Sequence, residues 1–241
     1  MARSRRTAGT GAISFLLATS GALMVAAAAQ RWWPACHLDH YDDPACLRLQ
    51  DHRYDFVLPM HPWVPAGHAA VLAGLSLLLL GTAVAALPLL LCPRRRPAYV
   101  WSLCAVLGTS QLVAGLSTLA SGLLGQPGPR IWEPLVVFVW LGWPVALTLT
   151  SILMAGHVRR PGTGWLVLIV LLAASTPLGQ VFLAPAVTGY TSLDTTPWSE
   201  AWGGVCLLLA AVAVWPAAYR RRRAPSVVAA VQRDVAVLEA R

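Results

Sequence analysis

The sequence has few charged residues, and it contains no lysine and no asparagine. Asp, Glu, Lys and Arg make up 12% of its 241 residues, about half the share found in a typical soluble domain. This scarcity excludes a water-soluble globule and a charge-rich disordered chain. All 18 basic residues are arginine. Because this bias fits a GC-rich bacterial genome, we expect a bacterial protein.

Motifs that carry chemistry are also missing. No Cys-x-x-Cys pair is present, so a thioredoxin-like redox role lacks its usual residues. No nucleotide-binding or catalytic motif stands out, and the apolar segments hold almost no ionisable residues in their middle. Ion pumps and proton-coupled carriers need such buried groups. We therefore expect neither an enzyme nor a pump, and no cofactor.

Long apolar runs are what the sequence has in abundance. Hydrophobic residues make up 57% of the chain, and the mean hydropathy is +0.61. Crossing the hydrocarbon core of a membrane takes about 20 residues of helix, and a helix bonds all of its own backbone groups. We predict an all-α polytopic transmembrane helical bundle with six spans. The predicted spans are 9–29, 66–91, 98–124, 132–156, 164–188 and 201–219.

The arginines predict how the bundle is oriented. Twelve of them flank the predicted spans on one face: Arg3, Arg5, Arg6, Arg94, Arg95, Arg96, Arg159, Arg160, Arg220, Arg221, Arg222 and Arg223. Four fall on the other face: Arg31, Arg48, Arg53 and Arg130. Cytoplasmic loops are enriched in Arg. Both termini are therefore expected in the cytoplasm. The membrane is expected to be the bacterial cytoplasmic (inner) membrane. The basic residues predict contact with lipid rather than with nucleic acid.

The two ends of the chain allow further interpretations. The first segment is either an uncleaved span or a signal peptide, since a basic start, an apolar run and Ala26–Ala29 resemble a cleavage signal. Residues 1–225 form the predicted membrane domain. The segment 226–241 has apolar residues at near-helical spacing, which predicts an amphipathic cytoplasmic tail.

The loop at 30–65 is the one substantial segment expected outside the bilayer, on the extracytoplasmic side. Its two cysteines, Cys36 and Cys46, face an oxidising compartment, so we predict a disulfide between them. Asp43 followed by Pro44 is a typical helix start and predicts a short helix over 44–55. On such a helix Arg48 would pair with Asp51. The loop is therefore expected to be ordered.

The same loop contains the densest group of possible metal ligands. His37, Asp39, His40 and Asp42 carry imidazole and carboxylate groups of the kind that bind divalent transition metals. Two histidines without a known third ligand make a weak pattern, and a polar loop that covers the bundle explains the same residues. Both interpretations stay open.

Polar residues inside the third and fifth predicted spans indicate a second candidate site. Gln111, Ser175, Thr176 and Gln180 would line a polar cavity between spans three to five. The structural alternative is that these spans form the bundle core, where small residues and hydroxyl groups join helices.

Three functions follow from these features. The first is a non-enzymatic accessory protein that binds a membrane or extracytoplasmic partner, or a ligand, through its disulfide-braced loop. The second is a small-solute transporter or channel component that uses the polar cavity. The third is a metal-binding membrane protein that uses His37 and His40.

Overall fold

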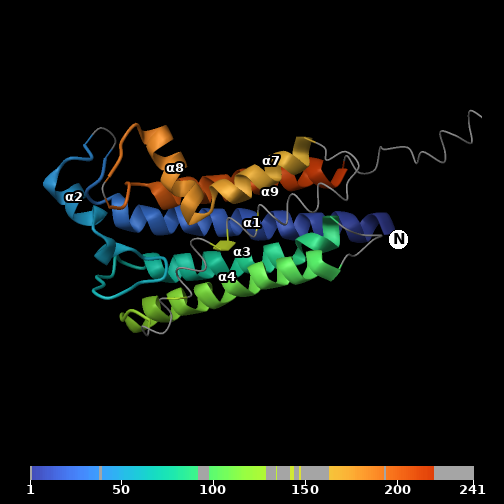
Figure 1. Ribbon diagram of the computed structural model, residues 1–241, viewed down its shortest axis with the longest axis horizontal. Helices are drawn as coiled ribbons and strands as arrows, with labels where there is room; N and C mark the ends of the chain where they lie inside the picture. Colours follow the sequence, from blue (N-terminus) through green and yellow to red (C-terminus); the bar gives the residue numbers. More distant parts are fainter. Residues whose placement is uncertain are drawn as a thin grey trace, which may run out of the picture.

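The computed structural model describes residues 2–37, 40–91, 98–128, 134, 142–143, 147, 163–192 and 194–219. Every regular element within this part is a helix, which confirms the all-α prediction. The helices are α1 (Ala2–Trp32), α2 (Pro44–Gln50), the 3₁₀ turn η1 (His52–Tyr54), α3 (Ala69–Leu91), α4 (Ala98–Leu124), α7 (Thr163–Ala174), α8 (Pro177–Thr188) and α9 (Ser199–Tyr219) (Figure 1).

Four helices, α1, α3, α4 and α9, are long and apolar enough to cross a membrane. They are rich in Ala and Leu, which favour helix, and a helix is one of the few structures that satisfies its backbone within hydrocarbon. The molecule therefore has the character of a membrane protein. The tail at 226–241 lies outside the described residues. So does the predicted fourth span at 132–156, except for residues 134, 142, 143 and 147.

Helix α1 lies in the middle of the described bundle. It packs against α3 on one side and α9 on the other, while α4 packs on α3 and α7 on α9 (Figure 1). The hydroxyl groups of Ser20 and Ser76 each donate to the other residue's backbone carbonyl, at 2.9 and 2.8 Å, and so join α1 to α3. We expected spans three to five to form the core, but among the described helices α1 has the central place.

Small residues allow these helices to approach closely. A Cβ atom built on Gly204 of α9 would lie 2.7 Å from the carbonyl oxygen of Gly21 in α1. A Cβ on Gly81 of α3 would lie equally close, at 2.7 Å, to the carbonyl oxygen of Gly108 in α4. No side chain fits at these crossings, so contact between backbones holds the bundle together, as in many membrane proteins.

The predicted span at 164–188 is divided into two helices. Helix α7 ends at Ala174, α8 begins at Pro177, and the two axes differ by 92°. Proline has no N–H to continue the helix, and its ring disfavours a helical conformation of the preceding residue. The predicted span at 164–188 is thus interrupted at Ser175 and Thr176, and the two helices form either a broken span or a re-entrant loop.

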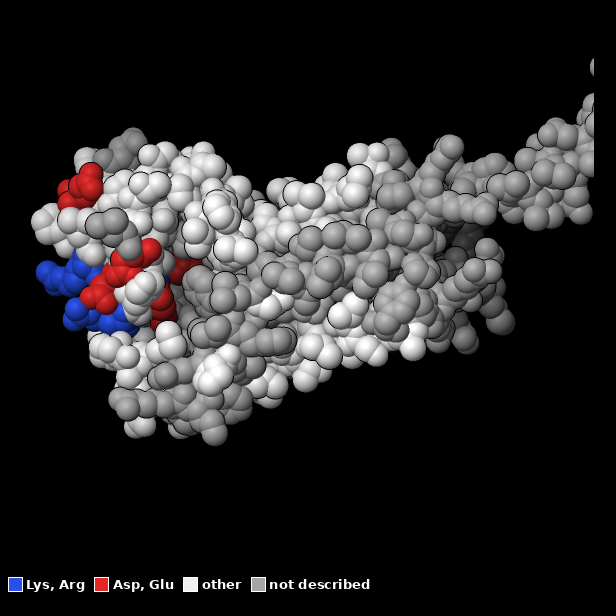
Figure 2. Space-filling view, in the orientation of Figure 1, with Lys and Arg blue, Asp and Glu red and all other residues white. Residues whose placement is uncertain are grey.

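Charged side chains gather at the end of the molecule where α2 lies (Figure 2). The described surface along the long helices is free of charge in the same view. The described residues of this end are 33–37, 40–68, 189–192 and 194–198, and we call them the cap. A charged end beside a described surface without charge in this view is the pattern expected when the body lies in lipid and the end in water.

Candidate functional site

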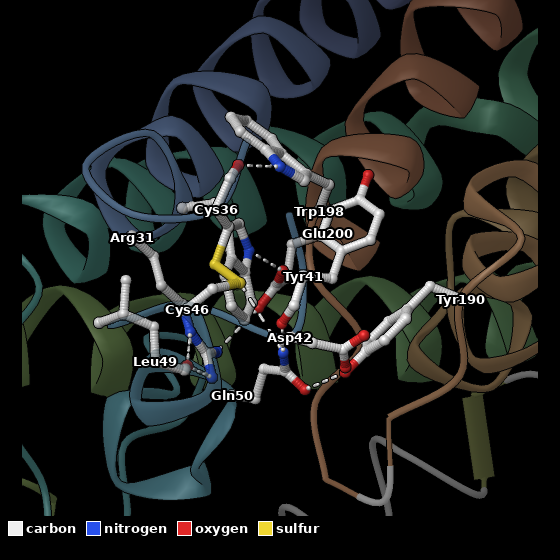
Figure 3. Close-up of a disulfide and its surroundings, with 11 residues drawn as sticks. Arg31, Cys36, Tyr41, Asp42, Cys46, Leu49, Gln50, Tyr190, Trp198 and Glu200 are labelled. Atoms are coloured by element: carbon white, nitrogen blue, oxygen red, sulfur yellow. Dashed lines mark hydrogen bonds and ion pairs between the residues drawn. A yellow bond between two sulfur atoms is a disulfide. The ribbon is translucent and has the colours of Figure 1, made fainter. Parts of the chain in front are cut away.

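The disulfide between Cys36 and Cys46 joins the start of the cap to α2 (Figure 3). The two Cα atoms are 4.8 Å apart and both cysteines are fully buried, so the predicted pairing is confirmed. The indole N–H of Trp198 donates to the Cys36 carbonyl at 3.0 Å, and the Gln50 amide donates to the Tyr41 carbonyl at 2.9 Å. The bridge therefore lies inside a packed layer.

Arg31, near the end of α1, is a buried cation with an exposed fraction of 1%. Its Nε and one terminal nitrogen donate to the Leu49 carbonyl at 3.0 and 2.7 Å. The other terminal nitrogen donates to Asp55 at 2.6 Å and to Glu200 at 3.1 Å. Its guanidinium carbon also lies 4.2 Å from the ring centre of Trp32. A buried charge is tolerated when it is paired and hydrogen-bonded in this way. We call Arg31, Asp55 and Glu200 the Arg31 cluster.

Polar contacts extend from this cluster across the cap. The two ring nitrogens of His52 lie 2.8 Å from Asp55 and 2.6 Å from Asp194. The Thr195 hydroxyl donates to Asp55 at 3.1 Å, and the Thr195 N–H donates to the Gln50 carbonyl at 3.0 Å. These bonds join η1 and α2 to the segment that leads into α9. Two parts of the chain that are far apart in sequence thus form one unit.

The predicted pair between Arg48 and Asp51 does not form. Helix α2 ends at Gln50, and Asp51 has an extended backbone, so these residues do not share a helical face. Asp51 instead binds Arg53 at 2.5 Å. The hydrogen bond from the Arg53 side chain holds the pKa of Asp51 below its ordinary value. Both side chains are exposed, so this pair adds little stability.

The predicted metal ligands are not gathered around one point in the described part of the cap. His37 and His40 are exposed, Asp39 lies outside the described residues, and Asp42 accepts a hydrogen bond from the Tyr190 hydroxyl at 3.2 Å. Among the described residues no group of three His, Cys, Asp or Glu side chains is arranged to hold a metal. Metal binding by this loop stays a prediction.

At the break between α7 and α8, side chains satisfy the backbone groups that the bend would leave unbonded. The hydroxyl of Ser175 donates to the Leu172 carbonyl at 2.8 Å, and that of Thr176 donates to the Ala173 carbonyl at 2.6 Å. Thr176 also caps α8 by accepting the N–H of Gly179 at 3.1 Å. Hydroxyl groups are a known replacement for backbone partners at breaks in membrane helices. The bend is therefore a stable feature.

A cavity of about 70 Å³ lies beside this break. Its polar lining consists of Gln111, Ser175, Thr176, Gln180 and Glu200. Four of these are the residues from which the sequence predicted a cavity, and the structure brings them together. A single buried water needs at least about 10–15 Å³ by this measure, so the cavity has room for more than one water or for a small solute. Val57 and Leu58 of the cap line one of its walls.

The amide of Gln111 is the unusual group in this lining. Gln111 is 3% exposed, and its side chain makes no hydrogen bond to any described residue. The amide is not among the fully enclosed side-chain groups that lack a partner. It faces the cavity, where a water or a polar solute can bond it. Glu200 lines the same cavity while its carboxylate binds Arg31 and the indole N–H of Trp32, the latter at 2.9 Å.

Sequence reasoning missed the roles of Arg31 and Glu200. Arg31 was counted only as a basic residue on the outer face, and Glu200 was given no role. The available signal was a charged residue at the end of one predicted span and another at the start of the last. Nothing in the sequence pairs two residues that are 169 positions apart.

The chain matches no protein-family model, and comparison with curated proteins and with solved structures finds no similar protein. The class is therefore defined by fold and site alone. It is an all-helical protein with helices that can span a membrane. A disulfide-braced cap covers one end of the bundle, and a polar cavity lies beside a broken helix.

Proposed function

We propose that the protein is a multi-pass protein of the bacterial cytoplasmic membrane that binds a small polar solute in the cavity, as a transporter or channel component. The observation that carries this proposal is the helix break at Ser175 and Thr176 beside the unbonded amide of Gln111. Irregular backbone at membrane depth occurs where it is buried in protein or lines a cavity. Many transporters bind their substrates at such breaks.

In this proposal the cap faces the extracytoplasmic side and both termini face the cytoplasm. The arginine distribution supports this orientation. The disulfide supports it independently, because disulfides persist in oxidising compartments and are rare in the cytosol. A solute would then reach the cavity from beneath the cap.

Uptake of urea into proteoliposomes tests the proposal, with Ala114→Leu as the perturbation. Ala114 is fully buried and lines the cavity from α4, so the larger side chain would fill the space. Ala105 is exposed on the same helix, and Ala105→Leu is the matched control. We expect protein-dependent uptake that Ala114→Leu lowers at least tenfold and Ala105→Leu preserves. Absence of protein-dependent uptake, or equal uptake by the two variants, would reject a solute path through this cavity.

A second candidate function is an accessory protein that presents the cap to another protein. The observation in its favour is a group of exposed apolar side chains on the braced cap. They are Trp33 (69% exposed), Leu47 (47%), Met60 (47%) and Val64 (39%). Exposed apolar groups of this kind mark interaction sites.

Crosslinking in native membranes, followed by mass spectrometry, tests this second function. A stoichiometric partner should be recovered with the native chain and with His61→Glu, whose site is also exposed on the cap. The same partner should be lost with Leu47→Glu. Recovery that does not depend on Leu47 would argue against docking at this patch. Metal analysis of the purified protein tests the third function, binding through His37 and His40.

A further inference from the structure

The polar groups around the cavity offer more free hydrogen-bond acceptors than donors. The hydroxyl protons of Ser175 and Thr176 are already donated to backbone carbonyls. One amide proton of Gln180 is donated to the Ser175 carbonyl at 2.9 Å. Among the described lining residues, the free side-chain donors are the second amide proton of Gln180 and the two of Gln111. The lone pairs of both amide oxygens and of the Ser175 hydroxyl remain available.

The first turn of α8 does not supply the donors that an anion would need. Helix N-termini bind anions through free backbone N–H groups. Here Pro177 has no N–H, the N–H of Gly179 is bonded to the Thr176 hydroxyl at 3.1 Å, and that of Gln180 is bonded to the Thr176 carbonyl at 2.9 Å. The backbone N–H groups of Gly179 and Gln180, which an anion would need at this helix end, are therefore already hydrogen-bonded within the chain.

The charge near the cavity is negative. Glu200 is the one acidic or basic side chain among the described lining residues. Arg31, which forms an ion pair with Glu200, also forms one with Asp55. The Arg31 cluster therefore has one positive and two negative groups, which sum to a formal charge of −1. Charges interact strongly where water is excluded. An anion would be repelled at this site, and a neutral or cationic solute would not.

We propose that the cavity takes a compact solute that is rich in hydrogen-bond donors, neutral or cationic, and that it excludes anions. A cavity of about 70 Å³ limits the solute to a few non-hydrogen atoms, because one water takes up about 30 Å³ in the liquid. This inference rests on the proposed function and specifies its substrate class.

Guanidinium, urea and nitrate test the inference because all three are planar, with four non-hydrogen atoms, but differ in charge and donors. The readout is the unfolding midpoint of the full-length protein in lipid nanodiscs, with sodium chloride as the salt control. At about ten times Kd, bound guanidinium or urea should raise the midpoint by roughly 3–6 °C. Nitrate should leave it unchanged.

Two variants locate the effect, and one serves as a control. Gln111→Leu and Gln180→Leu remove the free amides and should abolish the rise. Gln126→Leu makes the same change at an exposed position after α4 and should preserve it. A rise with nitrate that equals or exceeds the rise with urea would overturn the substrate class alone. No rise with any probe, together with no urea uptake, would overturn the proposed function as well. A rise that survives both cavity variants would place the bound solute elsewhere and overturn the inference.

Discussion

Replacing the buried arginine with methionine should loosen the cap and lower the stability of the whole protein. Arg31 makes five hydrogen bonds, to two backbone carbonyls and two carboxylates. Arg31→Met keeps an unbranched apolar stem but removes all five. It leaves Glu200, which is 8% exposed, and Asp55 without their cation.

The expected magnitude follows from this burial. Removing one partner of a buried ion pair costs about 3–5 kcal/mol, because the other charge stays buried without compensation. A chain of this length loses about 2–4 °C of melting temperature for each kcal/mol. Arg31→Met should therefore lower the midpoint by roughly 6–20 °C. Glu200→Gln in the same chain should recover part of this loss, since it removes one of the uncompensated charges.

Thermal unfolding followed by tryptophan fluorescence measures these midpoints. Arg53→Met is the matched control, because Arg53 makes its carboxylate contact at the surface and its loss should leave the midpoint within error. Our reasoning would be refuted if Arg31→Met unfolded within about 2 °C of Arg53→Met. It would also be refuted if the double variant were no more stable than Arg31→Met alone.

Three further predictions concern the cap, the cavity and the orientation. Reduction of the disulfide should destabilise the protein by about 2.7 kcal/mol, the chain-entropy value for a separation of 10 residues, measured as the midpoint with and without reductant. Gly203→Ala should lower urea uptake, because a Cβ at position 203 would overlap the Gln180 amide. Gly11→Ala is the control and should preserve uptake, because no atom lies within 4 Å of a Cβ at position 11. For the orientation, single cysteines are introduced at Gln126 or at Gly162 in a chain whose free cysteines are replaced. The cysteine at Gln126 should react with an impermeant label on intact cells, and the cysteine at Gly162 should not. The reverse pattern would show that the orientation is inverted.

The sequence predicted those features that depend on neighbouring residues. Apolar length predicts a membrane-spanning helix because the bilayer sets a required length, and α1, α3, α4 and α9 meet it. The disulfide was predictable because a loop that holds two cysteines has one possible pairing within it. Pro177 and its polar neighbours mark the break locally. Gln111 of α4 meets them around one space, and the polarity of the two spans was the signal for this one distant contact.

Features that depend on distant contacts were not predictable. A span with Pro177 and two hydroxyl residues indicates a weak helix, but a bend of 92° depends on what α8 packs against. The central place of α1 was also hidden, because its neighbours α3 and α9 lie far from it in the sequence. The burial of Arg31 depends on Glu200 and on the fold of α2, and a single sequence contains no signal for either contact.

The Arg31 cluster also sets an order of assembly for the protein. Arg31 emerges from the ribosome with the first helix, while its partner Glu200 begins the last described helix, 169 residues later. Until α9 has been synthesised and inserted, the guanidinium lacks one of its two carboxylates, and the binding surface for the cap is incomplete. A nascent or truncated chain without α9 therefore lacks the Glu200 contacts to Arg31 and Trp32. We therefore expect the cap to close late in biogenesis, and we expect protection of the cap from protease to distinguish a complete chain from a truncated one.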